Sequence, residues 1–479
     1  MEPPIKVAFL SLVKEKTIYL LGNVTLATHL REKTGAEVRI IDANWEDVLE
    51  SIKEYKPDIV CLSAISLSYP EAVSTAEKIK EFSDAITVIG GIHISTFPKS
   101  LKKCFDVGVV GEAEKTFEEL VNICTKNNQF STKLLKELKG TIYHSIEGKL
   151  IINKKRELIE NLDEIPVPDL GLLDPRYFSK RDLHTFKGRS GVQASLVSSR
   201  GCAFQCAFCA SPIFWEKRMR SFSVPRVVKE IKEYHDRFGV DHIQAYDDIF
   251  PITKKRMLEL IDEMERQGIL GKIRFAIQTR VHMIDEEFCG ILKRLGVETI
   301  SFGFESGSER MLRLLKTGPT SVERGRQSAS LCKKWGFSVY GSFIIGNPEE
   351  KLEDIQQTFS FIKKLSEMGV DGIDCFISSP FPGTPHWKYA VDNGLIKHDY
   401  DTNPPDFYSP ENAYLSDKTI PREQLTGIYN EIMAYLSARS QRRSIKSILL
   451  YPKEPRKKTL KRAAANPRET LRRIIYHMK

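Results

Sequence analysis

Short apolar runs alternate with amphipathic stretches between residues 5 and 127 of the chain. Apolar runs of this length, rich in Val and Ile, are typical of buried strands, and the stretches between them have the length and periodicity of helices. Strands that alternate with helices indicate a parallel sheet covered on both faces, which is a Rossmann-like α/β domain. The predicted strands are residues 5–12, 37–42, 59–63, 85–90 and 107–111. The predicted helices are residues 18–33, 45–55, 70–82 and 113–127.

A second alternation follows a connector. Residues 140–152 predict a hairpin that turns at Gly148, and the two prolines within residues 161–169 predict an extended linker. Beyond residue 189, six strand-and-helix units predict an open (β/α)6 partial barrel, in which functional side chains gather at the carboxyl ends of the strands. Its predicted strands are residues 193–199, 242–247, 274–279, 299–304, 339–345 and 372–377.

The C-terminal region differs from both alternating segments. Residues 398–416 are polar and predict a loop, whereas residues 419–437 predict an amphipathic helix. The apolar stripe of that helix consists of Leu425, Ile428, Ile432 and Tyr435. The chain is therefore expected to divide into a Rossmann-like domain (1–130), a connector (131–188), a partial barrel (189–397) and a helical, basic C-terminal region (398–479).

The composition is that of an ordinary globular protein. The 479 residues are 41% hydrophobic and 28% charged, which excludes disorder of the whole chain. The sequence does not open on an apolar signal region, and no run of about eighteen apolar residues occurs. We therefore expect a cytoplasmic protein that neither is exported nor spans a membrane.

Basic residues gather at the end of the chain. Residues 439–479 hold 14 Lys or Arg against two acids, whereas the net charge of the whole chain is +9. The excess belongs to the tail, so no nucleic-acid partner is expected. Aliphatic and aromatic residues stand among the basic ones in residues 444–451 and 470–476. Two hypotheses follow: the tail docks on anionic lipid heads and brings the protein to a membrane, or it packs on its own barrel.

Three of the nine cysteines lie close together. Cys202, Cys206 and Cys209 follow the first predicted barrel strand with C-x3-C-x2-C spacing. Three thiolates at this spacing can hold three corners of a 4Fe-4S cluster, and no fourth Cys nearby closes the site, so the fourth iron would stay open. The alternative, a structural zinc site, needs four ligands, and neither a second Cys pair nor an H-x3-5-H motif occurs. The other cysteines are scattered among apolar residues, which is typical of a reduced protein.

With this triad, the predicted barrel resembles the radical S-adenosylmethionine (SAM) superfamily. The resemblance implies that the open iron binds the amino and carboxylate groups of SAM, and that the reduced cluster cleaves SAM to methionine and a 5′-deoxyadenosyl radical. Residues at the carboxyl ends of the later strands follow the order of this family. The resemblance implies a SAM-binding role for Phe208, Asp247, Asp248, Arg280, Glu305, Ser306, Ile344 and Gly346.

These residues differ in the role that the resemblance implies. Asp247 and Asp248 are expected near the amino group of SAM, although acids at strand ends are often only helix caps. Arg280 could bind a carboxylate with two hydrogen bonds. Glu305 is suited to the ribose hydroxyls. The adenine element of the family, G-x-I-x-G-x-x-E, is matched except that Ser342 replaces its first glycine.

The N-terminal domain resembles the cobalamin-binding domain that precedes many radical SAM cores. Paired glycines after one strand and a G-E-A-E loop after the next let a bulky ligand approach the backbone at the sheet edge. The resemblance implies a cobalamin-binding role for Gly22, Gly90, Gly91, His93, Gly111 and Glu112. The D-x-H-x-x-G motif is absent, so cobalamin would bind base-off and without that histidine. The alternative is a Rossmann-like module that has lost its ligand.

The two resemblances together imply a cobalamin-dependent radical SAM enzyme. The expected activity is transfer of the methyl group of methylcobalamin to an unactivated carbon of a small-molecule or lipid-like substrate. An external electron donor of the flavodoxin or ferredoxin type would reduce the cluster. Two alternatives stay open: a cyclase or rearrangement enzyme that transfers no methyl group, and a binding protein in which cluster and corrin sense redox state or light.

Overall fold

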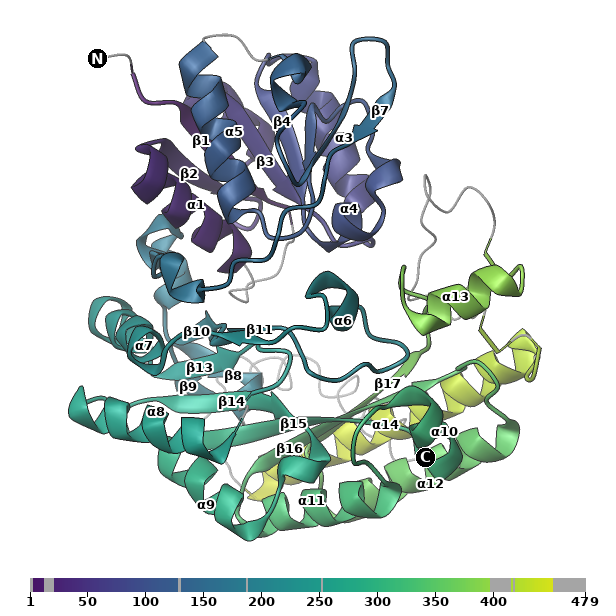
Figure 1. Ribbon diagram of the computed structural model, residues 1–479. Coiled ribbons are helices and arrows are strands. Elements are labelled where there is room, and N and C mark those ends of the chain that lie inside the picture. The colour runs from purple at the N-terminus through teal and green to yellow at the C-terminus, as the bar shows by residue number, and fades with distance from the viewer. Residues whose placement is uncertain are drawn as a thin grey trace, which may run out of the picture.

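Two sheets lie one above the other in the computed structural model, with a connector along one side (Figure 1). The structure describes residues 3–12, 21–127, 131–186, 188–250, 253–396, 415–416 and 418–450. Both sheets are parallel over most of their width, and helices cover them, as the alternation of the sequence predicts.

The N-terminal sheet has the strand order β2-β1-β3-β4-β5-β6-β7. Its strands are β1 (Lys6–Ser11), β2 (Glu37–Asp42), β3 (Ile59–Ser63), β4 (Ile86–Gly90), β5 (Val107–Val109), β6 (Thr141–His144) and β7 (Leu150–Ile152). Its helices are α1 (Leu21–Thr34), α2 (Val48–Tyr55), α3 (Tyr69–Lys80), α4 (Ile92–Thr96) and α5 (Glu114–Asn127). The first five strands are parallel, and the hairpin that turns at Gly148 extends the sheet as two antiparallel strands.

Helices on both faces explain why the strands of this sheet are apolar along most of their length. Helices α1 and α5 pack on one face, and α2, α3 and α4 pack on the other. Helix α2 begins where the side chain of Asp47 accepts hydrogen bonds from the amides of Leu49 and Glu50, each at 3.0 Å. Helix α4 is not among the predicted helices, because its five residues are too few to show a helical period.

The connector is packed, not extended as predicted. Three short 3-10 turns, at Leu162–Glu164, Leu170–Leu172 and Pro175–Phe178, replace the expected linker. Each turn begins at an Asn or Asp whose side chain accepts the amide hydrogen two residues later. The apolar side chains between them are buried, and the hydroxyl of buried Tyr177 donates a hydrogen bond to Asp42 at the end of β2. The connector therefore fastens the two domains together.

The second sheet is an open parallel barrel with the strand order β10-β13-β14-β15-β16-β17. Its strands are β10 (Gln193–Leu196), β13 (His242–Ala245), β14 (Arg274–Thr279), β15 (Val297–Glu305), β16 (Ser338–Ile345) and β17 (Gly372–Ile377). The outer helices are α7 (Val224–Phe238), α8 (Lys254–Arg266), α9 (Glu286–Leu295), α11 (Val322–Lys334) and α12 (Leu352–Glu367). Shorter helices are α6 (Ser211–Phe214), α10 (Glu309–Leu315) and α13 (Pro385–Asp392). All six predicted barrel strands are present.

Two small antiparallel ribbons were not predicted. One pairs β8 (Arg181–Leu183) with β9 (Arg189–Gly191). The other pairs β11 (Ser199–Arg200) with β12 (Arg220–Ser221), so the first barrel strand ends at Leu196, before the predicted boundary. This second ribbon carries the chain into and out of the cysteine loop.

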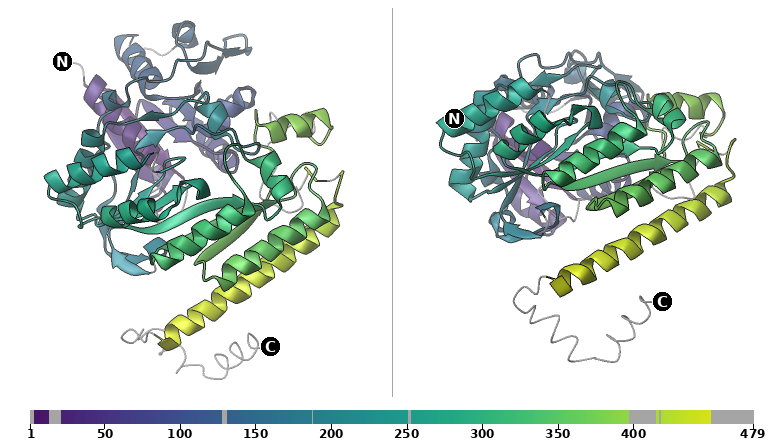
Figure 2. Two further views of the ribbon diagram at one scale, coloured as in Figure 1. Left: turned by 60° about the horizontal axis from the view of Figure 1, so that its bottom comes forward. Right: turned by 90° about the horizontal axis from the view of Figure 1, so that it is seen from below.

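Helix α14 (Arg422–Leu450) lies along β17 and α12 on the outside of the barrel (Figure 2). Leu425 and Ile432 are fully buried, and the rings of Tyr435 and Phe359 meet edge to face at 5.7 Å. The predicted helix is confirmed and runs on beyond its predicted end. The predicted loop lies almost entirely outside the described residues, as does the basic segment after residue 450. No helix in the described part of the chain is long and apolar enough to cross a membrane.

Candidate functional site

Cys202, Cys206 and Cys209 stand on the loop between β11 and α6, as the sequence predicts. All three are half-buried free thiols. Burial raises the pKa of Cys202, and it raises the pKa of Cys209 to about 11, so iron binding at this loop would displace thiol protons. Within the described residues, no three Cys, His, Asp or Glu side chains already converge as metal ligands.

A glycine fixes the start of the cysteine loop. Gly201 has a φ of +97°, and a Cβ atom there would lie 2.0 Å from the carbonyl oxygen of Arg218. No other residue fits this position without moving the backbone.

The segment after α10 supports the middle of the loop. The amide of Ala207 donates to the carbonyl of Leu315 at 2.8 Å, and the amide of Gln205 donates to the hydroxyl of Thr317, also at 2.8 Å. Arg280 donates to the carbonyl of Thr317 at 2.6 Å, and its guanidinium lies 3.6 Å from the ring centre of Phe204. The loop is therefore held from the barrel side by residues that are distant in sequence.

Arg280 also reaches the triad itself. Its Nη1 lies 3.7 Å from the Sγ of Cys206, which places a positive charge beside a thiol that must ionise to bind iron. The structure therefore places this arginine beside the cysteine loop, whereas the sequence alone indicated only that it could bind a carboxylate.

The two acids after β13 have different surroundings. Asp247 is buried and accepts hydrogen bonds from the amide and hydroxyl of Ser198, at 3.1 and 2.7 Å, and from the hydroxyl of Ser199 at 2.5 Å. Burial, opposed by these hydrogen bonds, raises its pKa to about 6. Asp248 accepts the amide hydrogen of Gly201 at 3.1 Å and faces a pocket. Asp247 braces the chain before the cysteine loop, and Asp248 is the acid that lines the pocket.

A buried lysine accompanies Glu305 at the end of β15. The Nζ of Lys316 lies 3.5 Å from Glu305 and 2.5 Å from the carbonyl oxygen of Gly303. Burial raises the pKa of Glu305 even though Lys316 opposes this shift. Ser306 is buried, and its hydroxyl lies 3.0 Å from that of Thr358, inside the turn that follows the strand. Sequence reasoning missed Lys316, since one lysine in a helical segment carries no motif.

The predicted adenine side of the barrel lies near the C-terminal helix. Gly346 has a φ of +75°, and a Cβ atom there would lie 2.7 Å from the side chain of Leu425 on α14. Ile344 is half-buried on β16. The ring of Phe208, on the cysteine loop, lies 6.4 Å from that of His386, which is buried at the start of α13.

His93 uses both of its ring nitrogens inside the N-terminal domain. Its Nδ1 lies 3.1 Å from the hydroxyl of Ser66 and its Nε2 lies 2.9 Å from that of Ser100. The ring stacks on Tyr69 at 3.9 Å, and burial lowers its pKa to about 4. Both glycines before it end β4, and Gly91, with a φ of +95°, lies too close to Ala64 for a side chain. In this arrangement, His93 has no nitrogen available for a metal.

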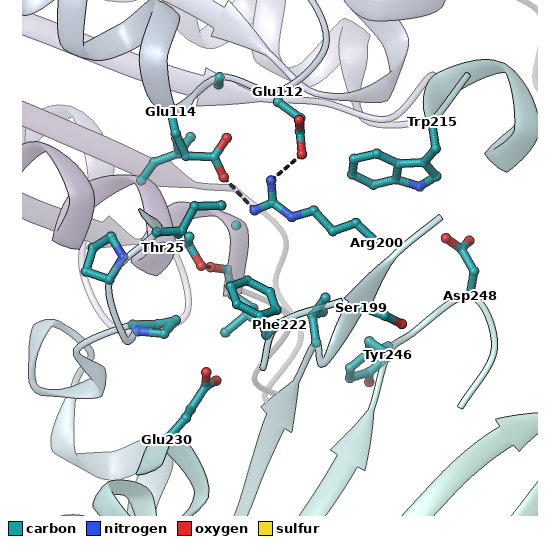
Figure 3. A pocket seen from close by; sticks show the side chains of 18 of the residues that line it. Thr25, Glu112, Glu114, Ser199, Arg200, Trp215, Phe222, Glu230, Tyr246 and Asp248 are labelled. Carbon is teal, nitrogen blue, oxygen red and sulfur yellow. Dashed lines mark hydrogen bonds and ion pairs between the residues drawn. The ribbon is translucent and has the colours of Figure 1, made fainter. Parts of the chain in front are cut away.

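Buried ion pairs join the G-E-A-E loop to the cysteine loop. Glu112 accepts from Arg200 at 2.6 Å, and Glu114 accepts from Arg200 at 2.5 Å (Figure 3). Glu112 also accepts from Arg220 at 2.8 Å. Arg200 stands two residues before Cys202 and pairs with Arg220 across the β11–β12 ribbon. Glu112 was predicted to contact cobalamin, but both of its oxygens bond within the protein. Arg200 and Glu114 were not predicted, because nothing in the sequence pairs residues so far apart.

A pocket of about 360 Å³ with mainly apolar walls lies at this boundary. Gly22 and Gly111 reach it from the N-terminal domain, and Asp248 reaches it from the barrel. A second pocket of about 180 Å³ also borders Gly111 and continues toward Gly383 after β17. The structure thus brings Gly22, Gly111 and Asp248 to one place between the domains and leaves His93 inside its own domain.

Two family models match this chain. The model of the radical SAM superfamily matches residues 196–362, and the model of the B12 binding domain matches residues 13–121. The two matches fall on the barrel and on the N-terminal sheet.

The relatives align over most of this chain. A protein of Pyrococcus horikoshii named as an uncharacterized methyltransferase is 33% identical over 78% of this chain and 79% of its own. The anaerobic magnesium-protoporphyrin IX monomethyl ester cyclase of Cereibacter sphaeroides is 26% identical over 80% of this chain and 61% of its own. Among solved structures, the radical SAM methyltransferase TsrM of Kitasatospora setae, with cobalamin and a 4Fe-4S cluster bound, has the same fold. It superposes with a TM-score of 0.64 at 20% identity, over 81% of this chain and 76% of that one.

Proposed function

Because the chain belongs to the radical SAM enzymes that carry a B12-binding domain, we propose that it is a cobalamin-dependent methyltransferase acting on an unactivated carbon. One observation supports this proposal most strongly. The loop that bears Cys202, Cys206 and Cys209 is joined by buried ion pairs to the G-E-A-E loop of the B12-binding domain. A cluster and a corrin bound at these loops would face the same space.

The residues present fit the cofactors that the family implies. The three thiols would hold the cluster and leave one iron for SAM, and the guanidinium of Arg280 lies beside Cys206. Asp248 and the Glu305–Lys316 pair would meet polar groups of SAM. When bound, the cluster supplies the electron that cleaves SAM, and cobalamin supplies the methyl group.

The N-terminal domain supports base-off binding of cobalamin without a histidine below the cobalt. The chain has no D-x-H-x-x-G motif, and both nitrogens of His93 bond to serine hydroxyls. Gly22 and Gly111 have no side chains, so a bulky ligand at the pocket can approach their backbone. The proposal also includes an external flavodoxin-type or ferredoxin-type electron donor.

The basic C-terminal tail is proposed to contact anionic membrane surfaces. Its charge and its mixed aromatic and aliphatic residues support this proposal. Liposome sedimentation of the full chain and of a chain ending at residue 438 tests it, because equal binding of the two would exclude the tail as the contact.

Ring closure without methyl transfer is the second candidate, and the similarity to a cyclase favours it. The two activities differ in their products. Methyl transfer yields S-adenosylhomocysteine together with 5′-deoxyadenosine, whereas ring closure yields no S-adenosylhomocysteine.

Anaerobic reconstitution with iron, sulfide and hydroxocobalamin tests the proposed function. We expect about four irons per chain, as one 4Fe-4S cluster requires, together with bound cobalt. With SAM and a strong reductant, the protein should form 5′-deoxyadenosine, and the Cys206→Ala variant should not. Bound zinc in place of iron, or no 5′-deoxyadenosine above the Cys206→Ala control, would refute the proposal.

A further inference from the structure

The cysteine loop meets solvent at its tip. Its start is tied to the N-terminal domain through Arg200, and its end lies near His386 at the start of α13. Between residues 201 and 210, Ala203 and Gln205 are the exposed residues, and each stands next to a cysteine in the sequence. A cluster held by this loop would therefore lie close to the surface at the tip, and an electron would reach it from this side.

Positively charged side chains surround the tip. The ring centre of Phe204, on the tip itself, lies 3.6 Å from the guanidinium of Arg280 and 5.5 Å from the ring centre of His282. Arg324, on α11, donates to the carbonyl of His282 at 3.3 Å. Burial lowers the pKa of His282, and the charges of Arg280 and Arg324 lower it further. These cations therefore act together at one side of the loop.

Two arginines of this region are exposed and form no ion pair with any described residue. One is Arg324, and the other is Arg313 on α10, two residues before the carbonyl of Leu315 that holds the loop. The acids at the starts of these helices have other partners: Glu309 accepts the amide of Val322 at 2.8 Å, and Glu323 pairs with Arg326 at 2.6 Å. The surface beside the tip therefore carries a net positive charge.

Exposed positive charge next to a redox site favours an acidic protein partner. Complementary charges steer such a partner to the surface and fix its orientation. Contacts between redox proteins are small and transient, so a few charges and a small apolar spot are sufficient. Leu314, next to Arg313 on α10, is 48% exposed and provides that apolar spot.

We propose that the electron donor docks at the tip of the cysteine loop, beside Arg313 and Arg324, and that this donor is a small protein with an acidic surface around its own redox centre. One electron passes from the donor to the cluster, so the donor is oxidised as the cluster is reduced, and no bond is made or broken. The docking face rests on the proposed function, which requires this electron. It deepens that function by naming the surface that the donor meets and the charge that the donor carries.

Isothermal titration calorimetry of the reconstituted protein with an oxidised, acidic flavodoxin tests the docking face without turnover. Arg313→Glu reverses an exposed charge that has no ion-pair partner among the described residues, and it should weaken binding about tenfold. Arg324→Gln removes one charge but can still donate to a carbonyl, and it should weaken binding less. Raising the ionic strength to about 1 M, where the screening length is about 3 Å, should reduce the difference between wild type and Arg313→Glu.

Lys272→Glu is the matched control for the change of charge. Lys272 is exposed just ahead of β14, at the opposite end of the barrel strands from the cysteine loop, so binding of the flavodoxin should not change. Iron content and a thermal melt establish that each variant is folded. Equal binding of the flavodoxin by wild type and Arg313→Glu would overturn the docking face, and so would a wild type that does not bind it.

Formation of 5′-deoxyadenosine in the same samples separates the docking face from the proposed function. Dithionite is a small reductant that needs no docked protein, so wild type and Arg313→Glu should cleave SAM equally with it, whereas Arg313→Glu should be slower with reduced flavodoxin. A protein that binds the flavodoxin as expected but cleaves no SAM with dithionite would refute the function and leave the docking face. A protein that cleaves SAM with dithionite but binds the flavodoxin equally with either residue at position 313 would refute the docking face and leave the function.

Discussion

Replacing Arg200 by glutamine removes the centre of the ion network between the domains. The side chains of Arg200, Glu112 and Glu114 are only 14%, 4% and 5% exposed. Removing one partner of a buried pair leaves the other charge without compensation, which costs about 3–5 kcal/mol of folding free energy. Glu112 keeps Arg220 at 2.8 Å, so we expect a cost at the low end of that range, about 3 kcal/mol.

Urea unfolding followed by tryptophan fluorescence measures this cost. Adding Glu114→Gln to Arg200→Gln should recover part of the lost stability, because the uncompensated charge is gone. Arg218→Gln is the matched control: Arg218 and Glu160 also form an ion pair near this boundary, but their side chains are 44% and 71% exposed. We expect no measurable change in the free energy of unfolding of Arg218→Gln. An Arg200→Gln protein as stable as the control would refute the reasoning.

The same network predicts how the stability of the protein changes with pH. Burial would raise the pKa of Glu114, but the guanidinium of Arg200 outweighs it, and the pKa is lowered. A carboxyl whose pKa is lowered on folding contributes stability above its unfolded pKa, and that stability is lost as the pH falls through the folded pKa. The difference in stability between wild type and Arg200→Gln should therefore shrink in acid. A difference that stays constant down to the acid transition would contradict this assignment.

Three further predictions concern single residues. Gly201→Ala should lower the iron content after reconstitution, because its Cβ would collide with the carbonyl of Arg218; iron analysis at unchanged cobalt content checks this. The electron paramagnetic resonance spectrum of the reduced cobalamin form should show no histidine nitrogen and should be the same in His93→Asn; nitrogen splitting that disappears in the variant would make His93 a ligand. Asp247, with a folded pKa of about 6, should contribute stability that falls as the pH rises from about 4 to 6. Thermal melts of wild type and Asp247→Asn should diverge over that interval and differ by a constant amount above it.

The elements of both sheets could be predicted because buried parallel strands leave a strong local pattern. Runs such as I-V-C-L-S in β3 are apolar on both faces, and each run is followed by a helix. The cysteine loop was predictable for a similar reason, since its three thiols lie within eight residues. Local patterns of this kind depend only on neighbouring residues.

What escaped prediction depends on contacts between distant residues. Glu112 looks like a ligand-loop acid in the sequence, and only the fold brings it to Arg200, which is 88 residues away. Asp247 and Asp248 are adjacent and chemically identical, yet a bend of the chain buries the first against two serines and turns the second to the pocket. The connector prolines indicate extension, but the Asn and Asp caps that fold it into turns act through single hydrogen bonds.

The contact between Gly346 and Leu425 has a consequence for how the protein is made. The β16 end that is expected to hold adenine is backed by a helix that begins at Arg422, near the end of the chain. The ribosome synthesises that helix only after every barrel strand. Until then, the barrel of the nascent chain lacks the helix that backs the end of β16. Loading of SAM is therefore expected to follow the synthesis of this helix, and a chain truncated before Arg422 would lack the helix that covers this side of the barrel.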